Sequence, residues 1–195
     1  MRNRFKGYIG ELKLRFALWF FLSGRYHILT DVTILLSQGK TSQIDHVVVS
    51  PYGIFVIETK NYKGRITIDI ENDIWTQGFS INSYEFYSPI RQNDGHISAL
   101  RYLLKNKQLP FINIVSFVGE ATFSDNLPTG VATGVLDTIT LIRGYKAVYI
   151  TPSEVTSITE MIKANRMPRN WRTKRLHIKN VKAKQSRFFD KSSIN

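Results

Sequence analysis

The sequence predicts an α/β fold in which a central mixed β-sheet is flanked by helices. Three observations predict it. A helical apolar pattern at residues 5–23 precedes several β-branched runs, two of these runs flank a Ser-Pro-Tyr-Gly turn, and a second helical pattern follows Pro89. With 195 residues and 43% hydrophobic side chains, the chain can bury a substantial core. We expect one main domain at residues 1–165 and a basic extension at residues 166–195.

The expected elements begin with a helix at residues 5–23, where apolar side chains recur at three- and four-residue steps. This recurring set is Ile9, Leu12, Phe16, Trp19 and Phe20. The run at 26–36 is β-branched and apolar, which predicts a strand, and Pro89 starts a helix to about residue 106. The other expected elements are hairpins at 43–64 and 64–79, strands at 111–118, 131–137 and 147–150, and a capped helix at 151–164. Beyond Pro168 the periodicity fades, which predicts a tail.

The composition excludes several classes of function. The chain has no cysteine, so disulfides, thiolate metal sites and a cysteine nucleophile are excluded. Its four histidines, at 27, 46, 96 and 177, lack the spacing of a zinc site. The most apolar stretch, 14–22, is about half of the roughly 20 residues that span a bilayer. We therefore expect a soluble, cytoplasmic protein without a membrane partner.

The net charge of +12 is concentrated near the end of the chain. Between residues 163 and 191, eleven Lys and Arg residues stand against one acid, Asp190, and aromatic residues are interleaved with them. Such a segment suits phosphate contact and stacking on bases, so we expect nucleic acid, and DNA in the first place, as the partner. The expected contacts are Arg166, Arg169, Arg172, Lys174, Arg175, Lys179 and Lys182. A solubilising tail is the alternative.

Charged residues occur at one end of the predicted hairpin. If Ser50 pairs with Gly53, Asp45 falls opposite Glu58, and Lys60 shares the face of Glu58. Two facing carboxylates repel each other and are costly to bury, whereas a divalent cation between them removes the repulsion. Oxygen ligands suit Mg²⁺ or Mn²⁺. In the alternative interpretation, Lys60 neutralises Glu58, and Asp45 is a solvated strand start.

Four short motifs follow one another in a particular order. They are Lys-Gly-Tyr-Ile-Gly-Glu at 6–11, Gln-Ile-Asp-His at 43–46, Ile-Glu-Thr-Lys-Asn-Tyr-Lys-Gly at 57–64, and Pro-Ile-Arg-Gln-Asn at 89–93 with His96 downstream. Over about residues 5–120, the sequence resembles the NERD (nuclease-related) domain of the PD-(D/E)XK restriction-endonuclease-like superfamily. The resemblance implies a restriction-endonuclease-like core. Ile44 replaces the proline of the wider superfamily, as is common in NERD-type sequences.

The resemblance also implies roles for individual residues. Asp45 and Glu58 would be the metal ligands, Lys60 the catalytic lysine, and Glu11 an auxiliary acid that faces the site. From its position one turn into the helix after Pro89, we expect Gln92 to contact the site or a phosphate; the alternative is a solvated glutamine at the start of the helix. A separate group, Asp69, Glu71 and Asp73, is expected to consist of solvated turn acids, and His46 is expected to be structural.

These features together predict a metal-dependent nuclease. It would use Mg²⁺ (or Mn²⁺), in one or two sites, to hydrolyse the phosphodiester bonds of nucleic acid by attack of a metal-activated water. Residues 1–165 would then form a NERD-type nuclease-like domain. Two alternatives remain: a nucleic-acid-binding module with the same fold that does not cleave, and a regulatory or partner-binding domain, because this fold hosts several activities.

Overall fold

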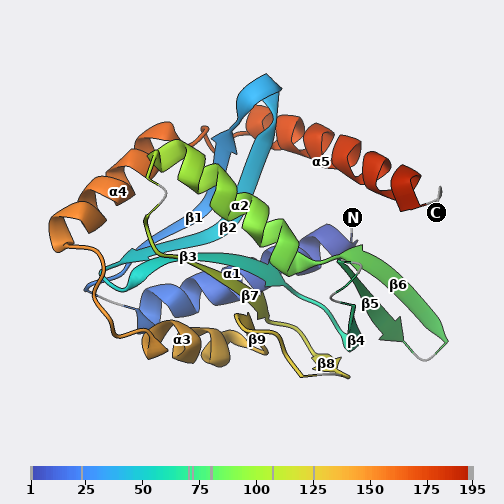
Figure 1. Ribbon diagram of the computed structural model, residues 1–195. Helices are drawn as coiled ribbons and strands as arrows, with labels where there is room; N and C mark the ends of the chain where they lie inside the picture. Colours follow the sequence, from blue (N-terminus) through green and yellow to red (C-terminus); the bar gives the residue numbers. More distant parts are fainter. Residues whose placement is uncertain are drawn as a thin grey trace.

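The computed structural model describes residues 2–192 except 23, 70, 72, 80, 107 and 125, with side chains between residues 7 and 181 (Figure 1). The helices are α1 (Arg2–Phe21), α2 (Pro89–Leu104), α3 (Val135–Gly144), α4 (Pro152–Asn165) and α5 (Trp171–Ser192), with a short 3-10 turn at Ser37–Gly39. The strands are β1 (His27–Leu35), β2 (Thr41–Ser50), β3 (Gly53–Lys60), β4 (Gly64–Asp69), β5 (Ile74–Phe79), β6 (Asn82–Tyr87), β7 (Phe111–Phe117), β8 (Ala121–Phe123) and β9 (Val131–Ala132).

The strands form two sheets. In the larger one the order is β1-β2-β3-β7-β9, where β1, β2 and β3 are antiparallel neighbours and β7 and β9 are added in parallel. The smaller sheet has the order β6-β5-β4-β8. The larger sheet is therefore mixed, and helices cover both of its faces (Figure 1). The α/β fold expected from the sequence is confirmed and is consistent with a restriction-endonuclease-like core.

The hairpin of β2 and β3 has the register that its sequence predicts. Ser50 pairs with Gly53, and the ladder continues to the pair His46 and Ile57. Gly53 has a φ of 138°, and a Cβ there would collide with Ile112, so the turn requires glycine. After Ile57 the strand continues without β2 and pairs with β7 alone. The two strands of the hairpin thus separate where Asp45 and Glu58 would face each other.

Apolar side chains fill both faces of the larger sheet. On one face α2 and α4 cover Val47, Val49, Ile54 and Val56, which are fully buried. On the other face α1 and α3 cover the alternating residues of the same strands, among them Phe55. A third cluster, rich in aromatic residues, joins the smaller sheet to β7 of the larger one.

The buried face of α1 differs from the one that the spacing of its apolar residues suggests. Leu14, Leu18 and Leu22 pack on the sheet, whereas Phe16 and Trp19 are 67% and 70% exposed. Because this part of α1 is apolar all round, periodicity alone does not tell which side is buried. The sheet accepts the aliphatic side, and the aromatic rings contact one another outside it.

Two of the predicted strands were wrong. The strand expected at 131–137 ends after Ala132, and Gly134, with a φ of 135°, precedes α3. Residues 147–150 form no strand, because the amides of Tyr149 and Ile150 both donate to the carbonyl of Pro51. The segment beyond Pro168 is largely helical, as α5. Strand β6 was missed, because its sequence is mostly polar and exposed.

Candidate active site at the open end of the hairpin

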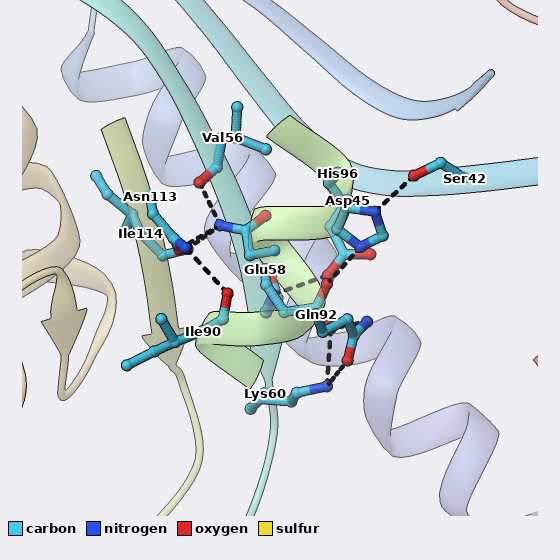
Figure 2. A network of polar contacts seen from close by, with 12 residues as sticks. Ser42, Asp45, Val56, Glu58, Lys60, Ile90, Gln92, His96, Asn113 and Ile114 are labelled. Carbon is cyan, nitrogen blue, oxygen red and sulfur yellow. Dashed lines mark hydrogen bonds and ion pairs between the residues drawn. The ribbon is translucent and has the colours of Figure 1, made fainter. Parts of the chain in front are cut away.

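The predicted site residues come from three elements that meet where β2 and β3 separate. Asp45 lies on β2, Glu58 and Lys60 on β3, and Gln92 and His96 on the first turns of α2 (Figure 2). Ser88 caps this helix by accepting a hydrogen bond from the amide of Arg91, and Pro89 starts it. The structure therefore brings together the acid, acid and lysine of the sequence motif with the predicted glutamine.

Glu58 is the centre of this network. Its Oε1 atom accepts hydrogen bonds from Lys60 Nζ and from Gln92 Nε2, each at 2.8 Å. Its Oε2 atom lies 3.3 Å from His96 Nε2. Burial alone would raise the pKa of Glu58, but the positive charge of Lys60 and the contact with His96 outweigh it and lower the pKa to about 2. Glu58 is therefore ionised at neutral pH.

Lys60 is held between two acceptors. Besides Glu58, its Nζ atom donates to Gln92 Oε1 at 3.0 Å, and its side chain is 14% exposed. Burial would lower the pKa of Lys60, but the negative charge of Glu58 outweighs it, so the pKa is raised. In this arrangement Lys60 is a protonated donor with a fixed position.

Asp45 has the opposite character to Glu58. Burial raises its pKa well above the usual range, and the negative charges of Glu58 and Glu11 raise it further. The backbone amide of Thr59, which donates to Asp45 Oδ2 at 2.8 Å, and the charge of Lys60 counteract only part of the rise. The two carboxylates of the motif are thus close enough to repel each other in the folded protein.

Glu11 approaches this pair from the other side of the sheet. Burial raises the pKa of this partly buried acid, and the charges of Asp31 and Glu58 add to the effect, while Lys174 lowers it. The helix is close to the strand ends, because a Cβ on Gly10 would lie 2.8 Å from the side chains of Asn61 and Val118. The glycine therefore lets α1 place Glu11 near the two motif carboxylates.

Several residues of the site were not assigned by sequence reasoning. Ser42 Oγ lies 2.7 Å from Nδ1 of His96, the ring that contacts Glu58. Asn93, which is fully buried, donates from Nδ2 to the carbonyl of Val56 and to Asn113 Oδ1, both at 2.7 Å, and so fixes α2 on β3 and β7. Its position directly after Gln92 in the motif was a usable signal. For Ser42 the sequence carried none.

Asp31 is a further residue that the sequence did not reveal. It has a φ of 50° in the middle of β1, a conformation that is uncommon for residues other than glycine. Its Oδ1 atom accepts a hydrogen bond from Gln43 Nε2 at 2.7 Å. Thr30 pairs with His46 and Val32 with Ile44, so a regular ladder would pair Asp31 with Asp45. This pair is not formed. The distortion lies beside the site, where strain often accompanies function.

Asp45 and Glu58 are the residues that could hold a divalent cation. Their oxygens are the hard donors that Mg²⁺ and Mn²⁺ prefer, and a cation would relieve the repulsion that raises the pKa of Asp45. Within the described residues, no group of three or more His, Cys, Asp or Glu side chains is arranged to hold a metal ion. The donor chemistry therefore fits a site with two carboxylates.

The other predicted acids and histidine lie away from this set. Asp69 and Glu71 are exposed, while Asp73 Oδ1 accepts a hydrogen bond from Arg91 Nε at 2.8 Å. His46 points to the opposite face of the sheet, where it is 1% exposed and burial lowers its pKa to about 4. The expectation that His46 has a structural role agrees with this position.

The basic residues of the last segment are placed in different ways. Arg172, Lys174, Arg175 and Lys179 are exposed on α5. Arg166 joins the edge of β1 by a bridge to Ile34, and Arg169 donates to Thr30 Oγ1 at 3.0 Å. Lys182 lies outside the residues whose side chains are described. Among the described helices, none has the length and apolar character needed to cross a membrane.

Comparison with known proteins gives two matches for this part of the chain. A family model described as nuclease-related domain, NERD, matches residues 6–118. An uncharacterized protein of Bacillus anthracis is 38% identical over 114 residues, which are 58% of this chain and 53% of the relative, so the chain spans about half of that relative's length. No solved structure matches the chain. The matched residues include every site residue on β2, β3 and α2, and the chain belongs to the NERD family of the PD-(D/E)XK restriction-endonuclease-like superfamily.

Proposed function

We propose that the protein is a divalent-metal-dependent nuclease that hydrolyses phosphodiester bonds, with DNA as its substrate. One observation carries the proposal: Asp45, Glu58 and Lys60 meet at the open end of the hairpin, beside Gln92. A protein that only bound nucleic acid would gain nothing from two repelling carboxylates in a partly buried corner. Membership of a nuclease-related family supports the same conclusion.

In this proposal Asp45 and Glu58 hold the cation, Mg²⁺ or Mn²⁺. When bound, such an ion supplies Lewis-acid stabilisation of a phosphoryl oxygen and lowers the pKa of water. The two residues differ before it binds, because Glu58 is fully ionised and Asp45 has a raised pKa. The metal would bind the ionised form of Asp45, so we expect metal affinity to increase with pH over the range in which Asp45 titrates.

The remaining residues act on the substrate. Lys60 is a protonated donor at a fixed position, which suits it to stabilise negative charge that develops on the phosphate. Gln92 orients it by accepting from Nζ and donating to Glu58. Glu11 lies near these groups and would act as an auxiliary acid beside the site.

A cleavage assay with four substrates tests the proposal. Plasmid, linear duplex, single-stranded DNA and RNA are incubated with the purified protein and Mg²⁺, Mn²⁺ or EDTA. We expect DNA cleavage with either metal and none with EDTA. Loss of cleavage in Glu58→Gln excludes a contaminating nuclease. Intact DNA under every metal condition would refute the proposal.

One observation favours a second candidate, a nucleic-acid-binding module that does not cleave. Both oxygens of Glu58 are engaged by protein groups, namely Lys60, Gln92 and His96, so the network holds together by itself. In that case the protein would bind DNA equally well in EDTA and in Mg²⁺. Binding that is independent of metal, together with absent cleavage, would favour this candidate.

A further inference from the structure

The C-terminal helix α5 is docked on the main domain by one face. Thr173, Leu176, His177 and Asn180 recur at three- and four-residue steps and are all buried or partly buried. His177 Nδ1 lies 3.1 Å from Thr41 Oγ1, and Asn180 Nδ2 donates to the carbonyl of Gly39 at 3.2 Å. Figure 1 shows α5 beside the end of the β1–β2 hairpin, where these residues lie. The helix therefore holds the start of β2.

The segment that α5 holds leads directly to the candidate active site. Ser42 follows Thr41 on β2, and its hydroxyl contacts His96 Nδ1 at 2.7 Å (Figure 2). The other nitrogen of His96 lies 3.3 Å from Glu58 Oε2. A short path of side chains thus runs from α5 through β2 and α2 to Glu58.

A second, exposed side of α5 offers a row of cations. Arg172, Arg175 and Lys179 are exposed and lie three and four residues apart, so they share one face of the helix. The Arg172 guanidinium lies 5.5 Å from the ring centroid of Trp171, a ring that is 66% exposed. A cationic row beside an exposed aromatic ring suits the phosphates and bases of nucleic acid.

We propose that α5 is a wall of the active site: its outer row binds the nucleic acid backbone, while His177 and Asn180 hold the Gly39–Ser42 segment that positions His96 against Glu58. This inference rests on the proposed nuclease function. His177 is a positioning residue, because it acts through Thr41 and Ser42 and does not reach the reacting atoms. Loss of the contacts made by His177 and Asn180 (the inner contacts) must therefore have a different kinetic effect from loss of the exposed charges on Arg172, Arg175 and Lys179 (the outer row).

The kinetic test compares two sets of variants in the full chain. His177→Ala with Asn180→Ala breaks the inner contacts, and we expect kcat to fall on the order of tenfold to a hundredfold, because small misplacement of catalytic groups is costly. Arg172→Ala, Arg175→Ala and Lys179→Ala together should raise KM and reduce the salt dependence of binding, with kcat retained. His177→Gln, which keeps a polar group at this position, should recover part of kcat. Glu160→Ala, on the exposed side of α4, is the matched control.

A second readout does not require cleavage. Amide hydrogen exchange of residues 39–44 and 92–96 is measured without metal, in wild type and in the His177→Ala, Asn180→Ala protein. We expect faster exchange in both segments of the variant, whereas the outer-row variant should exchange like wild type. A short DNA duplex added in EDTA should slow exchange at residues 39–44 of the wild type.

The outcomes separate the two proposals. If wild type does not cleave but the inner variant exchanges faster in both segments, the nuclease function fails and the structural link stands. If the inner variant changes only KM, or if its exchange at 39–44 and 92–96 equals that of wild type, the link between α5 and the site is overturned.

Discussion

The two ends of the β2–β3 hairpin are built from the same two strands but differ in strand pairing, polarity and charge. At the turn end, Val49 and Ile54 face each other in a regular ladder and are fully inaccessible to solvent. At the other end the ladder stops, and Asp45, Glu58 and Lys60 take the place of apolar residues. The closed end therefore stabilises the fold, whereas the open end concentrates charges that must be held apart by specific hydrogen bonds.

The comparison shows how a small domain combines a rigid framework with a cluster of buried charges. Parallel pairing with β7 continues along Glu58, Thr59 and Lys60 after β2 has departed. The backbone of the open end thus stays ordered while one side of it is released from the sheet. The residues that stabilise the fold and those proposed to act in cleavage lie on one strand, a few residues apart. Mutations at the two ends should therefore affect stability and activity separately.

The largest expected effect follows removal of a carboxylate at the open end. Glu58→Gln should lose Mg²⁺ binding, and cleavage should fall by at least about 10³-fold, because a bound cation supplies several kcal/mol of charge stabilisation in the transition state. Calorimetry with Mg²⁺ and a plasmid assay measure the two quantities. A Glu58→Gln protein that cuts DNA at the wild-type rate would remove Glu58 from the site.

Substitution of the lysine at the same end should separate chemistry from metal binding. Lys60→Ala leaves both carboxylates in place, so calorimetry should still detect Mg²⁺. Turnover should fall by about 10²–10⁴-fold, as is typical when a positioned group that moves protons or stabilises charge is lost. Equal losses of metal affinity and turnover would show instead that Lys60 mainly keeps the carboxylates in position.

His46 lies on the last pair of the ladder and should make stability depend on pH. Its pKa in the folded protein is lowered to about 4, chiefly by burial, from an unfolded value of 6.5. Because the pKa of His46 is lower in the folded protein, the unfolded chain binds the proton more readily. The contribution of neutral His46 to the free energy of unfolding is therefore present above about pH 6.5 and is lost as pH falls through about 4. This pKa difference corresponds to about 3 kcal/mol of unfolding free energy.

The pair of proteins that isolates this effect is wild type and His46→Leu. Urea unfolding between pH 7 and pH 4 should show a steeper loss of stability for wild type. Asp45 and Glu58 are common to both proteins, so their own titration largely cancels in the comparison. Parallel curves for the two proteins would contradict the assignment.

A shorter side chain at the closed end should reduce the stability of the fold without changing kcat. Val56 on β3 is fully buried in the core beneath α2. Val56→Ala should cost about 2 kcal/mol of unfolding free energy, because burial is lost and a small cavity forms. At a temperature where the variant is fully folded, kcat should equal that of wild type. A large drop in kcat would mean that the closed end also sets the geometry of the site.

The smallest expected effect has the opposite sign. Asp45→Asn removes a carboxylate that repels Glu58 and Glu11 while it keeps an oxygen for the amide of Thr59. We expect a gain of about 1 kcal/mol at neutral pH, or roughly 2–4 °C in Tm, together with loss of cleavage. Calorimetric melting at pH 7 decides it, and a lower Tm would show that the carboxylate stabilises the fold.

Much of the fold could be predicted from the sequence, because its signals are local. The Ser-Pro-Tyr-Gly turn and the alternation of side chains fix the hairpin register, and this register directs Asp45 and Glu58 to one region. The cap at Thr151 and Pro152 likewise predicts α4. The proximity of the motif residues follows from these local rules, whereas their roles as ligands and catalyst stay a prediction.

The features that could not be predicted depend on contacts between distant segments. The contact of Ser42 with His96 and that of Thr41 with His177 join residues far apart in the sequence, and no local pattern announces them. The left-handed conformation of Asp31 is imposed by its surroundings, since aspartate does not require it. Helix α5 buries only a narrow face that is partly polar, which explains why its apolar periodicity is weak.

The pairing of β3 with β7 has a consequence for protein synthesis. Chains emerge from the ribosome in order, and β7 is made long after β3 and after α2, which carries Gln92. Glu58 and Lys60 pair with Val115 and Phe117, and Asn93 reaches Asn113, so the site has no complete framework until β7 has emerged. We therefore expect that a nascent chain that stalls before residue 111 has no assembled site, so that the proposed cleavage activity would be delayed until β7 has been made.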